Sequence, residues 1–143
     1  MNLEVGQVLW LNVRYQTDII SKVPHPMLVA IANIEDNNIE VIAIDKAKNK
    51  LHQLFSEANF FINSDDPKEK VIQVDSYAQL NNSLTIEYFP ELVKFRRNKA
   101  KLSKNKLDEL LEEYNKYHSN NIIPDERIVY MSKEDILKLN KLS

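Results

Sequence analysis

The chain has 143 residues, of which 43% are hydrophobic and 28% are charged; its net charge is −2 and it contains no cysteine. These values predict one globular domain with a hydrophobic core, and they exclude a disulfide framework, a thiolate metal site and a polycation. No apolar run approaches the roughly 20 residues of a membrane span and no signal peptide is visible, so we expect a cytoplasmic protein without a membrane partner.

Short β-rich runs dominate the first part of the chain. Three of them predict strands, at residues 8–13, 27–34 and 39–44. The segment Asp36-Asn37-Asn38 separates the last two runs and predicts the turn of a β-hairpin. Because the chain has one glycine, Gly6, we expect asparagine pairs to supply much of the left-handed backbone that turns require. These pairs are residues 37–38, 81–82 and 120–121.

The next part of the chain is less regular. Apolar residues in 46–61 follow helical spacing, and this segment is ambiguous between a short helix and an irregular excursion. Further strands are predicted at residues 71–74 and 83–86 and within 122–130, and Tyr88-Phe89-Pro90 ends the second of these.

Two helices have clear starts in the sequence. Ser103 is a good N-cap, and Leu102 before it can pack on Leu107. Ser132 and Asp135 form a pair similar to a capping box at the start of a second helix. The summed pattern predicts a mainly-β fold with peripheral helices (α+β), built as a small, strongly bent barrel. We expect residues 1–118 to form the barrel and its closing helix, and residues 119–143 to form a C-terminal extension packed on it or flanking it.

Four segments, in this order, resemble the MazF/PemK-like toxin family. They are Gly6–Trp10 followed by His25–Ile31, then Val41–Lys46, Val71–Leu84 and Ala100–Leu111. The likeness covers Val5 to about Tyr117. It implies an SH3-like, PemK-like β-barrel and the toxin of a type II toxin–antitoxin system. It further implies a homodimeric endoribonuclease that cleaves single-stranded RNA without a metal or another cofactor and is inhibited by an antitoxin protein.

The chain departs from the family pattern at functional positions. His25 stands where the family has an arginine before proline, Asp45-Lys46 falls near its Thr/Ser motif, and Ala100 replaces a glycine. These departures keep a second reading open, in which a catalytically inactive barrel binds a protein or nucleic-acid partner.

RNA cleavage without a metal needs a base, an acid and a cation that holds the phosphate. His25 can supply acid or base chemistry, since the ordinary pKa of histidine is about 6.5. Asp45 can act as the base or orient His25, and Arg14 offers a planar fork that matches phosphate oxygens. The candidate RNA-binding residues are Tyr15, which can stack on a base, and the cations Lys22, Lys46, Arg96 and Arg97.

Each candidate also has an ordinary structural explanation. A loop histidine such as His25 can be merely exposed, and Asp45 with Lys46 can be turn residues or a surface ion pair. Arg14 and Tyr15 can simply mark a strand end. The basic stretch (residues 94–106), which contains no acid, suits RNA or an acidic partner, or else forms a solvated loop and helix start. The dispersed histidines argue against a structural zinc site.

Overall fold

In the computed structural model, the residues that the structure describes are 3–13, 24–46, 59–64, 71–72, 74–120 and 129–140. Within them one six-stranded sheet runs in the order β1-β2-β3-β5-β4, and β6 pairs with β5. The β5–β6 pairing is parallel and the others are antiparallel. The strands are β1 (Val8–Leu11), β2 (His25–Asn33), β3 (Asn38–Lys46), β4 (Asn59–Ile62), β5 (Ser76–Glu87) and β6 (Val129–Met131). The expected mainly-β fold with peripheral helices is confirmed.

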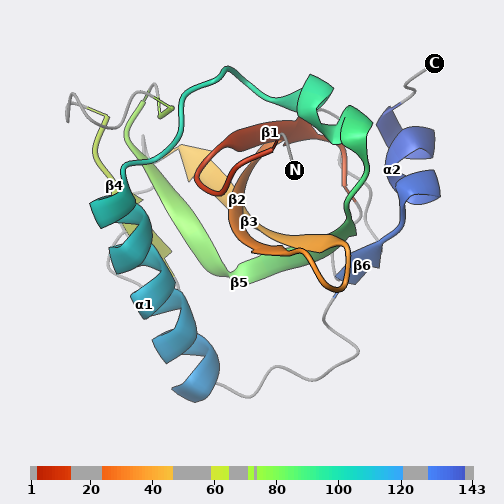
Figure 1. Cartoon of the computed structure of the whole chain (residues 1–143). Coiled ribbons are helices and arrows are strands. Elements are labelled where there is room, and N and C mark those ends of the chain that lie inside the picture. The colour runs from red at the N-terminus through yellow and green to blue at the C-terminus, as the bar shows by residue number, and fades with distance from the viewer. Residues whose placement is uncertain are drawn as a thin grey trace.

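The sheet curls strongly, so that β1, β2, β3 and part of β5 surround a filled interior (Figure 1). Because side chains alternate between the two faces of a strand, the apolar residues separate into two cores. The inner core lies within the curl and includes Leu9, Leu11, Met27, Val29, Ile39, Val41, Leu84, Ile86, Leu92, Met131 and Ile136. The outer core lies on the other face and includes Val8, Leu28, Ala30, Ile42, Ile44, Ile62, Val71, Ile72, Ala78, Leu80, Leu102, Leu107, Leu110 and Tyr114.

The β2–β3 hairpin follows the prediction, because its turn falls on residues 34–37. Asn37 has a φ of 54°, so asparagine supplies the left-handed conformation that this turn requires. The Asn33 amide donates to Asp36 Oδ2 at 2.9 Å, and this bond closes the turn.

The β5 region differs from the prediction. The strand predicted at 71–74 is wrong for the residues described there, since Val71, Ile72 and Val74 lie outside any strand. Val71 and Ile72 are only 0% and 3% exposed. They are buried by packing into the outer core, so their hydrophobicity does not reflect strand pairing.

The turn predicted at residues 81–82 is also wrong, because both asparagines lie inside the 12-residue strand β5. The register explains how the strand passes through them. Ile42 pairs with Ser83 and Ile44 pairs with Ala78, so five steps along β5 match two along β3. The extra residues form a bulge, and a bulge bends its strand. The Asn81-Asn82 pair therefore lies where β5 bends within the curled sheet, and the chain does not reverse direction there.

Helix α1 (Lys104–Asn120) packs against the outer core (Figure 1). Its predicted N-cap is confirmed, since the Lys106 N–H donates to Ser103 Oγ at 3.3 Å. The helix is described as far as Asn120, and residue 121 lies outside the described residues, so the turn expected at 120–121 cannot be assessed. The helix considered within 46–61 cannot be assessed, because residues 47–58 lie outside them too, while β3 extends to Lys46 and β4 begins at Asn59.

Helix α2 (Lys133–Asn140) begins with the predicted capping box. The Ser132 N–H donates to Asp135 Oδ2 and the Asp135 N–H donates to Ser132 Oγ, both at 3.2 Å. At the other end of α2, the Asn12 N–H donates to Asn140 Oδ1 at 2.8 Å, and Asn140 Nδ2 donates to Asn12 O at 3.1 Å. The Lys133 N–H donates to Glu87 Oε1 of β5 at 2.8 Å, and Ile136 lies in the inner core, so contacts to the sheet and to the end of β1 hold α2 along its length.

Candidate functional site

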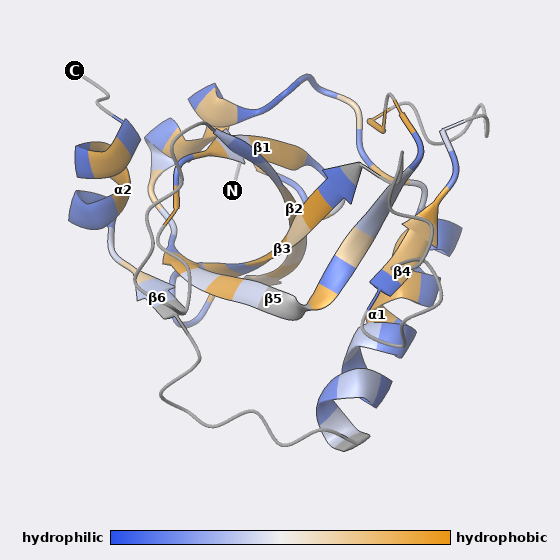
Figure 2. Cartoon of the chain, turned by 180° about the vertical axis from the view of Figure 1, so that it is seen from behind, coloured by the Kyte–Doolittle hydropathy of each residue, from blue (hydrophilic) through white to orange (hydrophobic). Residues whose placement is uncertain are grey.

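The ends of three strands place polar residues at one end of the sheet. His25 begins β2, Asp45 precedes the last residue of β3, and Tyr77 follows the first residue of β5. Asp45 pairs directly with Tyr77. Figure 2 shows that the end of β3 is hydrophilic whereas the preceding part of the strand is largely hydrophobic. The curled sheet therefore has an apolar body and a polar end, which we call the polar strand end (His25, Asp45, Tyr77 and Gln79).

His25 and Asp45 lie at the same end of the β2–β3 ladder. The last pair of this ladder joins Met27 to Ala43, and each candidate lies two residues beyond that pair on its own strand. Since residues two apart point to the same face, His25 and Asp45 share the face of Met27 and Ala43. Both side chains are partly exposed. The fold thus places two of the residues that the sequence proposed for proton transfer at the same end of the ladder.

The carboxylate of Asp45 is held by the neighbouring strand. Tyr77 Oη donates to Asp45 Oδ2 at 3.2 Å, and Gln79 Nε2 lies 3.5 Å from the same oxygen, a long contact. Tyr77 is only 2% exposed. A carboxylate restrained in this way is suited to orient a neighbouring donor. Sequence reasoning missed Tyr77 and Gln79. These residues lie two apart on β5 and share a face, but only the β3–β5 register shows that this face is next to Asp45.

Several predicted site residues lie outside what the structure describes. Arg14, Tyr15 and Lys22 fall in residues 14–23, between β1 and β2. Lys46 closes β3, but its side chain is not among those described. Their roles in binding phosphate or bases therefore stay predictions.

Arg97 is built into the outer face of the sheet. Its backbone N–H donates to Val8 O at 2.8 Å, and its Nη1 donates to the carbonyl of Val71 at 3.2 Å. The guanidinium carbon lies 4.5 Å from the centroid of the Trp10 ring, a cation–π distance. Burial lowers the pKa of Arg97, and its Nε has no hydrogen-bond partner among the described residues. The Arg97 guanidinium therefore contributes to the packing of the outer face through its contacts with Val71 and Trp10.

Trp10 is a third residue that sequence reasoning did not assign to a site. Its side chain is 40% exposed, although the residues before and after it are fully buried. Trp10 pairs with Pro26, the neighbour of His25, and adjacent residues of a strand point to opposite faces. The Trp10–Arg97 pair therefore lies at the same end of the sheet as His25, on the opposite face. An exposed indole beside a guanidinium can stack on nucleic-acid bases.

The other cations of the basic stretch have varied surroundings. Arg96 is partly exposed and bridges to β1 through its backbone. Lys101 Nζ lies 3.2 Å from Glu4 Oε1, and Lys106 Nζ lies 3.4 Å from Glu109 Oε2. Exposed pairs of this kind contribute little to stability. These three cations take part in separate local contacts, and none of those contacts is with His25.

Comparison with known proteins adds no relative. No protein-family model matches the chain, and no curated protein matches it. Among the described residues, no three or more His, Asp or Glu side chains gather where they could hold a metal ion. No helix in the described part of the chain is long and apolar enough to cross a membrane.

Proposed function

We propose that this chain is a cytoplasmic, metal-independent endoribonuclease that cleaves single-stranded RNA, as the toxin of a type II toxin–antitoxin system. One observation carries the proposal: His25 and Asp45 lie on the same face at the same end of the β2–β3 ladder. An imidazole and a carboxylate so placed can act together in proton transfer. The order of sequence segments that resembles the MazF/PemK-like family supports the same activity.

The proposed reaction is an internal transfer at phosphorus. Neutral His25 takes the proton of the ribose 2′-hydroxyl, and the 2′-oxygen then attacks the phosphorus. The bond to the 5′-oxygen breaks, and the imidazolium returns the proton to this leaving oxygen. Asp45 orients His25 and stabilises its charged form. The products are a 2′,3′-cyclic phosphate and a 5′-hydroxyl, so atoms and protons balance.

Cations and an aromatic ring complete the proposed site. Arg14 holds the phosphate with its planar fork, while Lys22 and Lys46 raise the local positive potential. Tyr15 stacks on a base of the RNA. In the family that the chain resembles, the active form is a homodimer and an antitoxin protein inhibits it; we propose the same for this chain.

The test is cleavage of a long single-stranded RNA in EDTA. We compare the wild type with His25→Ala and with His118→Gln, a matched control that removes a histidine from α1, where His118 Nε2 lies 3.0 Å from Leu80 O. We expect discrete fragments with cyclic-phosphate ends from the wild type and the control, and at least a 100-fold slower reaction from His25→Ala. Equal cleavage by folded His25→Ala would exclude His25 as the proton carrier.

The second candidate is a barrel that binds nucleic acid without cleaving it. One observation favours it: the Trp10 side chain is 40% exposed, and it lies beside the Arg97 guanidinium. Intact RNA in the cleavage assay, together with a mobility shift that Trp10→Ala abolishes, would select this function over the nuclease.

A further inference from the structure

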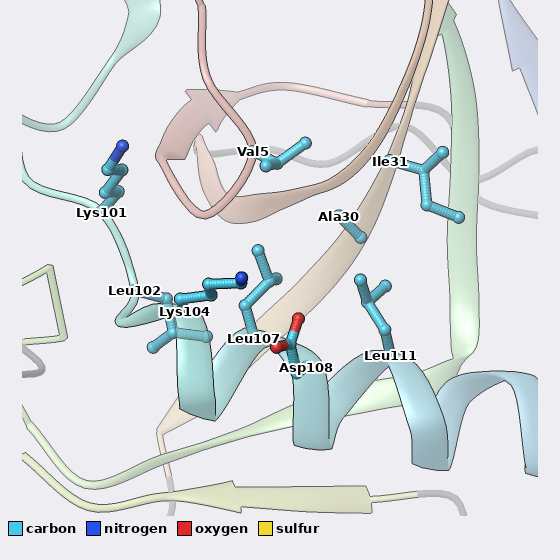
Figure 3. Close-up of a pocket in the computed structure, with 9 residues that line it drawn as sticks. All are labelled: Val5, Ala30, Ile31, Lys101, Leu102, Lys104, Leu107, Asp108 and Leu111. Atoms are coloured by element: carbon cyan, nitrogen blue, oxygen red, sulfur yellow. The ribbon is translucent and has the colours of Figure 1, made fainter.

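A groove lies on the outer side of the molecule, between the first turns of α1, the middle of β2 and the loop before β1 (Figure 3). Its volume is about 490 Å³, which falls in the range of small-molecule sites. The wall is mostly apolar, with side chains contributed by Val5, Ala30, Ile31, Leu102, Leu107 and Leu111. No residue of this groove belongs to the polar strand end, so the groove is a separate feature.

The walls of the groove are held by backbone bonds. The Gly6 N–H donates to Val29 O at 2.7 Å, and the Leu102 N–H donates to Gly6 O at 2.9 Å. Gly6 has a φ of 93°, and a Cβ there would lie only 3.2 Å from the backbone nitrogen of Leu102. The single glycine thus allows the N-terminal loop to approach the start of α1. A site whose walls are fixed in advance binds without a large ordering cost.

The charged groups of the groove are unevenly placed. Lys101 and Lys104 lie at the end nearest the start of α1, and Figure 3 shows Lys104 extending alongside Leu107. Lys101 Nζ lies 3.2 Å from Glu4 Oε1, and Figure 3 shows its side chain directed away from Lys104, so Lys104 is the cation that faces the groove at this end. The N-terminus of α1 adds its own partial positive charge at this end.

The remaining length of the groove has a different character. Asp108 is the acidic residue of the lining and lies one turn beyond Lys104, where it disfavours an anion further along the helix. The far end is formed by Ile31, Leu111 and Ala30, whose small side chain is only 2% exposed. From Lys104 to Leu111 the helix rises about 10 Å. The groove therefore has a cationic end and an apolar end.

We propose that this groove binds a straight-chain fatty acid of medium length. The carboxylate lies beside Lys104 at the start of α1, and the acyl chain passes Leu107 toward Ile31. Charge complementarity sets the direction of the ligand, and burial of methylenes supplies most of the affinity. This site is independent of the proposed nuclease activity, so each can fail without the other.

Calorimetric titration with decanoate, below the concentration at which it forms micelles, tests the site. We expect saturable 1:1 binding, with about fourfold weaker binding for each methylene removed. Decanol, which lacks the charge, should bind several-fold more weakly. Lys104→Gln should weaken decanoate binding by about fivefold, and more at low than at high salt. Lys116→Gln, on an exposed part of α1 beyond the groove, is the matched control and should leave binding unchanged.

Two substitutions test the apolar end and the mouth. Val5 is 37% exposed at the mouth, so Val5→Trp should fill the groove and abolish binding while the circular dichroism spectrum stays unchanged. Leu111→Asn should weaken binding without blocking entry. Absence of saturable binding to the folded wild type, or equal binding of decanol and decanoate, would overturn the proposal. A concentration-dependent dimer that Val5→Trp disrupts would assign the groove to a second copy of the chain and overturn it equally.

Discussion

The phenol of Tyr114 joins helix α1 to the sheet and makes stability depend on alkaline pH. Tyr114 Oη donates to Glu40 Oε2 at 3.2 Å and lies 3.0 Å from Ser83 Oγ. The residue is 7% exposed, and its burial raises the pKa to about 12. In an unfolded chain the pKa of tyrosine is about 10. Between these values the unfolded state loses its proton first, so the free energy of unfolding falls as the pH rises.

The size of this effect follows from the pKa difference. Two pKa units correspond to about 2.7 kcal/mol, and we expect about 2 kcal/mol because solvent screens a phenol that is not completely enclosed. Most of this loss, about 1.5 kcal/mol, should be present by a pH of about 11.5. The pH dependence of other groups is common to the wild type and to a variant at this position, so it cancels in their difference.

Tyr114→Phe should therefore reverse its effect with pH. At a pH of about 8 we expect the variant to be less stable by about 1 kcal/mol, because the hydroxyl bonds are lost. At a pH of about 11.5 it should be the more stable protein, since phenylalanine has no proton to release. Urea unfolding followed by circular dichroism measures both values, with Tyr130→Phe, on a half-exposed side chain, as the baseline. An equal difference at the two pH values would refute the reasoning.

Three further substitutions test the fold. Gly6→Ala should lower the free energy of unfolding by about 2 kcal/mol, because φ is 93° at this position; an unchanged urea midpoint would contradict this. Asn140→Ala should cost about 1–2 kcal/mol through its lost bonds to Asn12, and an unchanged melting temperature would show that α2 is not held by this pair. Arg97→Lys keeps the charge but loses the planar group that lies over Trp10; we expect a loss of about 1 kcal/mol and a red shift of the tryptophan emission, whereas an unchanged spectrum would argue against the contact.

The parts of the fold that were predictable from the sequence are those that depend on residues close together in the chain. The hairpin turn needs a left-handed residue, and Asn37 provides one within four residues of sequence. The helix starts at Ser103 and Ser132 depend on a side-chain oxygen meeting a backbone N–H three residues ahead. These bonds form from neighbouring residues, so the order of the amino acids alone determines them.

Signals that depend on distant partners were misread. Val71 and Ile72 have the composition of a strand, but packing in the outer core buries them without sheet pairing. The Asn81-Asn82 pair has the composition of a turn, but the curl of the sheet places it in β5. In both cases the free energy of burial and of strand pairing outweighs the local preference.

The same division applies to the candidate site. The sequence by itself determined which residues can carry protons or hold phosphate, such as His25 and Arg14, because that capacity belongs to the side chain. Only the tertiary structure decided that Asp45 is held by Tyr77 and that Arg97 lies over Trp10. Those contacts depend on strand register and on packing between segments far apart in the chain. No local pattern specifies them, because each joins residues that no short stretch of sequence contains together.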